Sequence, residues 1–206
     1  MAIPSEKLRQ KWLEALLPLV NEGGWSASNA EKAAETVGLS AGDQALAAPN
    51  GITDLIDQFF DDAADQMLID LSTKDLGAFR THQRVAVALR AWLDVLGPNR
   101  EAVRKAAGRG MLPWGAGAAT RRVWKVADTV WEAAGDTATD YNRQTKRGLL
   151  SLVIPSIVLK WLNADDPSEV DNHIEARLKQ AMALGQAGGK IVGPALDLLG
   201  RLKNRK

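Results

Sequence analysis

The chain has 206 residues, which is enough for one compact domain or for one domain with a small helical lobe attached. Its 26 basic and 25 acidic residues leave a formal net charge of +1, so no overall field draws the molecule toward nucleic acid or anionic lipid. The absence of cysteine excludes disulfides, thiolate nucleophiles and cysteine-based metal sites, and it fits a reducing compartment such as a bacterial cytoplasm.

The first third of the chain has the apolar spacing of helices. Apolar residues recur at helical intervals from Ser5 to about Val20, where Pro18 should bend or end the helix. Ser28 and Glu31 have the spacing of a capping box and predict the start of a second helix. A glycine-containing turn, a short helix and a long amphipathic helix follow, so four helices are expected before residue 72.

The remainder of the chain predicts further helices and no strand. Clusters of Gly and Pro separate them, as between residues 108 and 117, and Pro155 should kink the eighth helix. The longest nearly apolar run, from Gly148 to Leu159, is too short and too interrupted to cross a membrane. The predicted helices span residues 5–20, 28–37, 41–48, 52–71 and 79–96, a sixth from about 99, then 123–134, 137–162 and a ninth from 167 or 168.

The segment after Gly188 and Gly189 differs in character from the rest of the chain. At about 100° per residue its apolar side chains cluster in an arc of roughly 160°, with most of its charged residues opposite. This pattern is typical of an amphipathic helix lying in a membrane interface, and packing against a second protomer is the alternative. The residues expected to form this membrane helix are Lys190, Ile191, Val192, Leu196, Leu199, Leu202, Lys203 and Arg205.

The residues that usually carry catalysis or bind metals are sparse. His82 and His173 lie on separate predicted helices, and neither has a second ligand at metal spacing. A di-metal bundle site would need Glu-x-x-His pairs, which are absent. We therefore expect no enzyme activity, no metal and no cofactor. A solvated helix face is the expected role of the acidic residues Asp54, Asp57, Asp61, Asp62 and Asp65.

The second and third predicted helices have a helix-turn-helix outline, which raises the question of DNA binding. Between Lys32 and Lys74 there is no Lys or Arg, whereas acidic residues are frequent in this window. Neutralisation of phosphates supplies most of the non-specific affinity for DNA, so this lobe should repel a duplex. We expect no nucleic-acid partner.

The stretch WEAAGDTATDYNRQTKRGLL, residues 131–150, closely resembles the signature of the Coq-nine family of ubiquinone-biosynthesis proteins, A-G-D-x-[ST]-T-D-[FY]-N-W-Y-T-[KR]-R. Weaker similarity extends to GGWS at 23–26, to PNGITDLIDQFF at 49–60 and to the helix after Asp166, and so covers most of the chain. The resemblance implies an all-α, TetR-like bundle of about nine helices that has lost DNA binding. In one departure, Arg143 and Gln144 replace an exposed Trp-Tyr pair, a residue type that dominates interface hot spots.

The family resemblance further implies a lipid pocket that binds prenylated quinone precursors, a surface that presents them to a di-iron hydroxylase, and membrane attachment through the C-terminal amphipathic helix. We therefore predict a non-enzymatic lipid-binding accessory protein of ubiquinone biosynthesis that binds a prenylated quinone or a phospholipid. It would be a homodimer in the bacterial cytoplasm, peripheral on the inner face of the plasma membrane. The alternative is a TetR-family transcriptional regulator with a hydrophobic effector pocket.

This interpretation divides the chain into three parts and gives two further groups of candidate residues. Residues 1–71 would form a degenerate helix-turn-helix lobe, 72–185 the lipid-binding and dimerisation domain, and 186–206 the membrane helix. The expected lipid-pocket residues are Phe79, Leu89, Trp92, Trp124, Trp131 and Leu152. The expected partner surface comprises Asp136, Thr139, Asp140, Tyr141, Asn142, Arg143, Gln144, Lys146 and Arg147.

Part of the signature also has a purely structural interpretation. Thr137 and Asp140 have the spacing of a capping box, and Asp136 would be favourable at the positive end of the same helix dipole. Lys146 and Arg147 lie one or two turns further on and would be within reach of Asp140.

Overall fold

The computed structural model describes residues 4–110, 116–137 and 141–203, with side chains for 4–110, 117–137 and 143–185. These residues form α-helices and one 3-10 helix, and no strand occurs among them. In chain order the elements are α1 (Pro4–Gly23), α2 (Ala27–Thr36), α3 (Ala41–Ala47), α4 (Ile52–Ser72), α5 (Thr81–Leu96), η1 (Gly97–Asn99), α6 (Arg100–Gly110), α7 (Ala116–Ala133), α8 (Tyr141–Asn163) and α9 (Pro167–Lys203). The prediction of an all-α fold is confirmed.

Two details of the first lobe differ from the sequence prediction. Helix α1 continues through Pro18 to Gly23, since the buried residues Leu16 and Val20 hold it against the core on both sides of the proline. Helix α2 is capped by Ser26, whose hydroxyl accepts a hydrogen bond of 3.1 Å from the backbone N–H of Asn29. The predicted capping role of Ser28 is therefore wrong.

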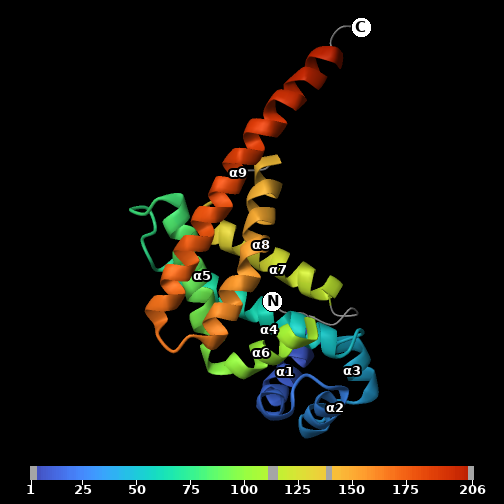
Figure 1. Ribbon diagram of the computed structural model, residues 1–206. Coiled ribbons are helices and arrows are strands. Elements are labelled where there is room, and N and C mark those ends of the chain that lie inside the picture. The colour runs from blue at the N-terminus through green and yellow to red at the C-terminus, as the bar shows by residue number, and fades with distance from the viewer. Residues whose placement is uncertain (1–3, 111–115, 138–140, 204–206) are drawn as a thin grey trace.

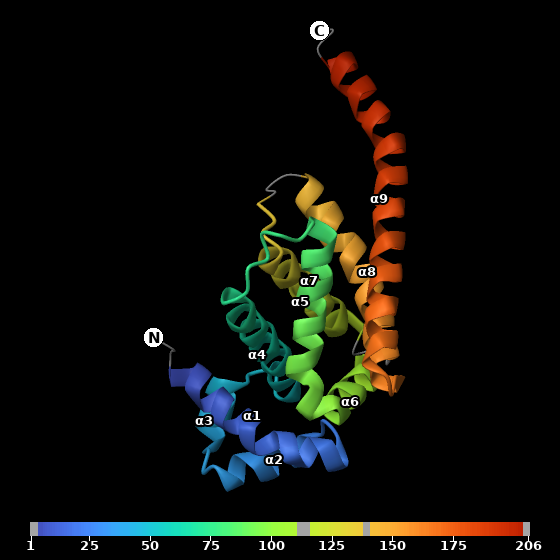
Figure 2. The same ribbon diagram turned by 90° about the vertical axis from the view of Figure 1, so that its left-hand side faces the viewer.

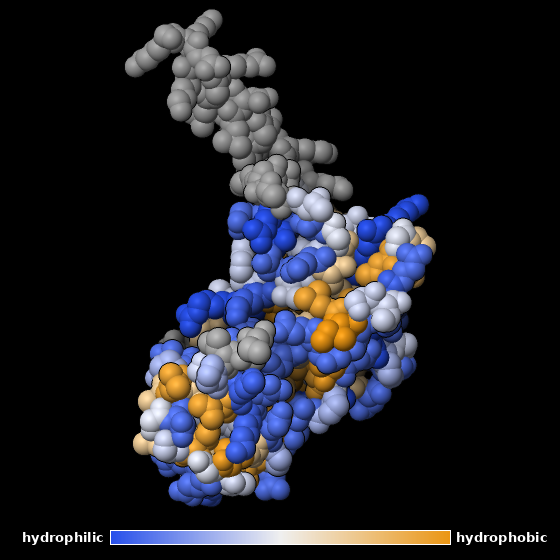
Figure 3. Space-filling view, turned by 180° about the vertical axis from the view of Figure 1, so that it is seen from behind, coloured by the Kyte–Doolittle hydropathy of each residue, from blue (hydrophilic) through white to orange (hydrophobic). Residues whose placement is uncertain are grey.

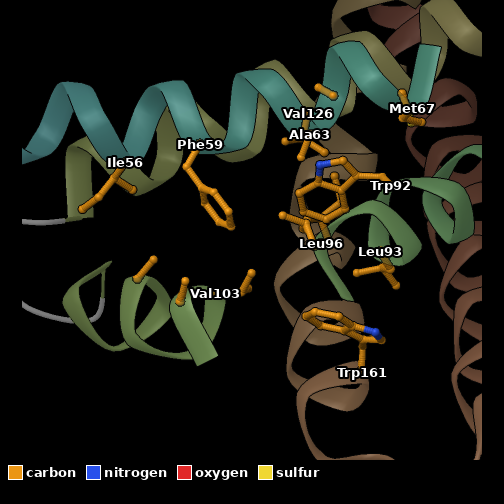
Figure 4. Packing of buried hydrophobic residues seen from close by; sticks show 14 of the residues in the cluster. Ile56, Phe59, Ala63, Met67, Trp92, Leu93, Leu96, Val103, Val126 and Trp161 are labelled. Atoms are coloured by element: carbon orange, nitrogen blue, oxygen red, sulfur yellow. The ribbon is translucent and has the colours of Figure 1, made fainter. Parts of the chain in front are cut away.

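One tryptophan packs the lobe of α1 to α3 together, and another joins this lobe to the larger bundle behind it. The indole N–H of Trp12 donates to the carbonyl of Ala30 at 2.8 Å, which fixes α1 on α2. The indole N–H of Trp25 donates to the carbonyl of Ala102 in α6 at 2.9 Å, and its ring lies 5.6 Å from that of Phe59 in α4. One continuous cluster of buried apolar residues spans both parts, and Figure 4 shows a portion of it. The buried cluster continues across residue 71, so the predicted domain boundary at this position stays a prediction.

The basic residues of α6 contact the carboxyl ends of two other helices. The Lys105 ammonium donates to the carbonyls of Val20, Asn21 and Glu22 at 3.2, 2.9 and 2.7 Å. On the other side, Arg100 and Arg104 donate to carbonyls at the end of α8 and just beyond it, the latter at 2.5 Å to Leu162. Cations are favourable at these negative ends of helix dipoles.

Helices α8 and α9 run side by side, and α9 extends past the bundle, away from the lobe of α1 to α3 (Figures 1 and 2). The predicted membrane segment is not a separate helix, because the α9 backbone is helical from Pro167 through to Lys203. The side chains predicted to contact the membrane, from Lys190 to Arg205, lie outside the part of the chain whose side chains the structure describes. No helix in the described part of the chain combines the length and apolarity needed to span a bilayer.

Candidate functional site

An apolar cavity lies where α4, α5, α6, α7 and α8 meet. Its volume is about 270 Å³, which is just below the usual range for ligand pockets, roughly 300–1,000 Å³. The lining residues are Phe60, Trp92, Val103, Ala106, Ala107, Gly110, Ala119, Arg122, Val123, Val126, Ile154, Pro155, Val158 and Leu159. Pro155 and Leu159 are exposed on α8, so they mark the open side of the cavity.

Small residues create this space. Ala106, Ala107 and Gly110 on α6 face Ala119 on α7, where longer side chains would fill the gap. Two aromatic rings form another part of the lining, Trp92 of α5 and Phe60 of α4, whose ring centroids lie 6.3 Å apart. Figure 4 shows the Trp92 ring between α5 and α4, beneath Ala63. The cavity thus has the apolar walls that are typical of small-molecule pockets.

Among the described residues that line the cavity, Arg122 is the one that carries a charge. Its Nε donates to Asp57 of α4, and its side chain is 13% exposed. A second, polar pocket of about 330 Å³ adjoins the cavity and shares Phe60, Arg122 and Val126 with it. The other residues of the polar pocket are Asp61, Ala64, Asp65, Lys125, Asp128 and Thr129.

Of the six predicted lipid-pocket residues, Trp92 alone lines this cavity. Leu89 is fully buried in the core, whereas Phe79, Trp124 and Leu152 are 42%, 38% and 73% exposed. Trp131 is partly buried at the junction of α7 and α8, where its indole N–H donates to the carbonyl of Lys146 at 3.2 Å. Apolar periodicity finds the faces that helices bury, but a cavity forms where buried side chains are too short to meet. Clustered Ala and Gly on neighbouring helices would have been the better signal.

The family signature forms a tight junction between α7 and α8. Gly135 has a φ of +78°, which lets the chain turn at the end of α7, and the N–H of Asp136 donates to the carbonyl of Trp131 at 3.0 Å. The turn directs the Asp136 carboxylate at α8, where it accepts bonds of 2.9 Å from Arg147 and 2.6 Å from Lys146. Asp136 therefore closes α7 and pairs with α8, rather than starting the next helix.

Asp128 on α7 extends this ionic network. It accepts hydrogen bonds from Arg147 and, at 3.0 Å, from Arg143. The side chains of Arg147 and Asp136 are each 5% exposed, so this pair is held inside the protein. Lys146 also lies over the ring of Trp131, 5.2 Å from its centroid. The charged side chains of the signature on α8 thus bind α8 to α7 and to the turn that follows it.

The remaining predicted partner residues are placed only in part. Gln144 is exposed, and Arg143 is engaged with Asp128. Thr139 and Asp140 lie outside the described residues, and for Tyr141 and Asn142 only the backbone is described, at the start of α8. The partner surface, and the pairing of Lys146 and Arg147 with Asp140, stay predictions.

The network makes stability depend on pH through Asp128. Burial opposes its ionisation, but the hydrogen bonds from Arg147 and Arg143 outweigh that effect and hold the pKa of Asp128 below its usual value of 3.8. A carboxyl with a lowered folded-state pKa stabilises the protein above its unfolded-state pKa, and this contribution is lost as the pH falls through the folded-state value.

We therefore expect Asp128→Asn to flatten the acid limb of the stability curve. Urea unfolding should show the wild type losing stability more steeply than the variant as the pH is lowered from about 6 to about 3. Parallel curves for the two proteins would contradict this role of Asp128.

Comparison with known proteins agrees with the signature. The COQ9 family model matches residues 116–185, which cover α7, α8 and the first part of α9. "Ubiquinone biosynthesis protein COQ9, mitochondrial" of Xenopus tropicalis is 26% identical over 196 residues, or 87% of this chain, and the Homo sapiens protein of that name is 25% identical over 197 residues, or 90%. The resemblance to the COQ9 family is confirmed. The chain spans about three fifths of the length of these COQ9 relatives, 59% and 61% respectively.

The TetR-like fold is confirmed by a solved structure. The TetR transcriptional regulator from Nitrosomonas europaea ATCC 19718 superposes with a TM-score of 0.66 at 18% sequence identity, covering 85% of this chain and 98% of that one. At this identity the likeness concerns the fold. The COQ9-like chain keeps the helix-turn-helix outline in α2 and α3, but it has no Lys or Arg between Lys32 and Lys74.

Proposed function

We propose that this chain is a lipid-binding accessory protein of ubiquinone biosynthesis, which holds a prenylated quinone intermediate and presents it from the membrane to a di-iron hydroxylase. The observation that carries the proposal is the apolar cavity. Two of the helices that line it, α7 and α8, belong to the segment that matches the COQ9 family model, and the other three are α4, α5 and α6. Apolar walls with a single charged member suit a hydrophobic ligand with a polar end.

Membrane attachment and partnership belong to the same proposal. The exposed side of the cavity lies on α8, and α9 continues beyond the bundle with the amphipathic sequence pattern of an interfacial helix. A homodimer, the hydroxylase contact and a position on the inner face of the bacterial plasma membrane complete the proposal. The TetR-type regulator is the weaker alternative, because the lobe that would contact DNA is acidic.

Filling the cavity tests this function. Ala106 is buried on α6 and lines the cavity, so Ala106→Leu should occupy space that the ligand needs. We expect prenylated quinones or their precursors to co-purify with the wild type from its host, and their recovery to fall by about tenfold in the variant. Mass spectrometry of organic extracts measures both.

The matched control is Ala45→Leu, an equal change at an exposed position of α3. It should leave lipid recovery unchanged. Wild-type protein that carries no lipid, or an Ala106→Leu protein that carries as much as the wild type while circular dichroism shows both folded, would refute the proposed function.

A further inference from the structure

We infer that Arg122 binds the head group of the cavity's ligand, and that this head group presents an uncharged oxygen, such as a carbonyl or ether oxygen, rather than a carboxylate or a phosphate. The inference deepens the proposed function and rests on it, because it assumes that an amphiphile enters the cavity. It assigns both a binding residue and a chemical class of ligand.

The first support is the position of Arg122 between two unlike spaces. The cavity on one side is apolar apart from Arg122 itself, and the adjoining pocket on the other side is lined mainly by polar and charged residues. Both spaces share Phe60, Arg122 and Val126. A ligand with an apolar body in the cavity would bring its polar end to this shared boundary. Of the three shared residues, Arg122 is the one whose side chain can donate a hydrogen bond there.

The second support is the unused donor capacity of Arg122. A guanidinium carries five N–H donors, and the one hydrogen bond of this side chain within the described part of the chain runs from Nε to Asp57. The two terminal nitrogens therefore keep their donors available in a side chain that is only 13% exposed. A hydrogen bond to a cation on such a mostly buried side chain contributes more than one at the open surface, because water screens it less.

The charges nearby decide between an uncharged and an anionic head group. Arg122 is already paired with Asp57, and Lys125 is paired with Asp61 at 2.7 Å. The polar pocket also contains the carboxylates of Asp65 and of Asp128, and Asp128 is already paired with Arg143 and Arg147. An anion at Arg122 would therefore meet a cation that Asp57 already neutralises, with the carboxylate of Asp65 in the same pocket, whereas a carbonyl or ether oxygen accepts the same hydrogen bonds and adds no charge.

The size of the cavity limits how much of the ligand it encloses. A volume of about 270 Å³ holds a ring or a short length of chain, so the remainder of a long ligand must leave by the open side. Leu159 lines the cavity and is 53% exposed, which places an apolar contact at that exit. The ligand is thus bound by the part next to its head group.

The experiment is calorimetric titration of the full-length protein with two probes whose alkyl chains are of similar length, decylubiquinone and decanoate. The first offers uncharged oxygens and the second a carboxylate. Arg122→Met keeps the apolar stem and removes all the donors, and we expect it to weaken decylubiquinone binding by about tenfold or more. Arg121→Met, an exposed neighbour on α7, is the matched control and should leave the affinity unchanged.

Asp57→Asn separates head-group binding from a structural role of the ion pair. Both Arg122→Met and Asp57→Asn break the ion pair between these two residues. Asp57→Asn, however, leaves the N–H donors of Arg122 in place and removes only the negative charge of the carboxylate. We expect Asp57→Asn to keep its affinity for decylubiquinone and to bind decanoate more tightly than the wild type does. Equal losses of decylubiquinone binding in both variants would mean that the pair only holds α4 and α7 together, and would overturn the inference.

The remaining outcomes also discriminate. Tighter wild-type binding of decanoate, with Arg122→Met abolishing it, would assign an anionic head group and refute the class named here. Unchanged decylubiquinone binding in Arg122→Met would remove Arg122 from the site while leaving the proposed function intact. A wild type that binds neither probe would instead count against the cavity as a lipid site, and with it against the proposed function.

Discussion

Replacing Arg147 by Met is expected to lower the free energy of unfolding by about 2–3 kcal/mol, because it removes two charge-assisted hydrogen bonds, one of them in a buried ion pair with Asp136, while Asp136 keeps its ion pair with Lys146. Asp136 and Arg147 are each 5% exposed, so water cannot take over the lost interaction. Asp128 would lose a partner as well, although it keeps Arg143. Urea denaturation followed by circular dichroism measures the loss.

The matched control is Arg143→Met, one helical turn earlier on α8. Arg143 pairs with Asp128, but both side chains are about two fifths exposed, at 42% and 39%. Exposed ion pairs contribute about 0–1 kcal/mol, so this variant should be nearly as stable as the wild type. Similar losses in the two variants would show that burial of the pair with Asp136 is not what makes Arg147 important.

The second large effect is expected at Leu89, where Leu89→Ala should cost about 2–5 kcal/mol. Leu89 is fully buried in the core and does not line the cavity, although the sequence placed it in the lipid pocket. A truncation in the packed core loses the buried methyl groups and leaves a void. Lipid recovery from the folded variant should be unchanged.

Leu152→Ala provides the comparison for Leu89. Leu152 is 73% exposed on α8 and was also placed in the pocket from the sequence. Its truncation should change the stability by less than about 0.5 kcal/mol. If Leu89→Ala cost as little and at the same time reduced lipid recovery, Leu89 would belong to the ligand site after all.

The sequence predicted the helices well because each is a local pattern. Amphipathic spacing placed Ile52–Ser72 and Ala41–Ala47 to within one residue at each end. The cap of α2 was misplaced because Ser26 and Ser28 both precede apolar residues at helical spacing, and the spacing to Glu31 favoured the wrong one. Gly24, with a φ of +84°, turns the chain early and makes Ser26 the cap, which sequence spacing alone does not reveal.

The site was less predictable because it depends on contacts between distant segments. The cavity needs short side chains on α6 and α7 to face each other, and no pattern within one helix shows this. Likewise, Asp136 was interpreted as a helix start from its neighbours in sequence, whereas its partner Arg147 lies eleven positions further on. The signature was recognisable in the sequence, but the ion pairs that its side chains form between α7 and α8 are visible only in the structure.

The contacts of α6 fix how the cavity can respond to a ligand. Its amino-terminal arginines bind the end of α8, and Lys105 binds the end of α1, while Val103, Ala106 and Gly110 line the cavity between them. Moving this wall outward would break hydrogen bonds at both neighbouring helix ends. The cavity wall is therefore rigid on this side. Under the proposed function, a ligand would lose little entropy by ordering this wall, and a molecule too broad for the gap between α6 and α7 would be excluded by shape.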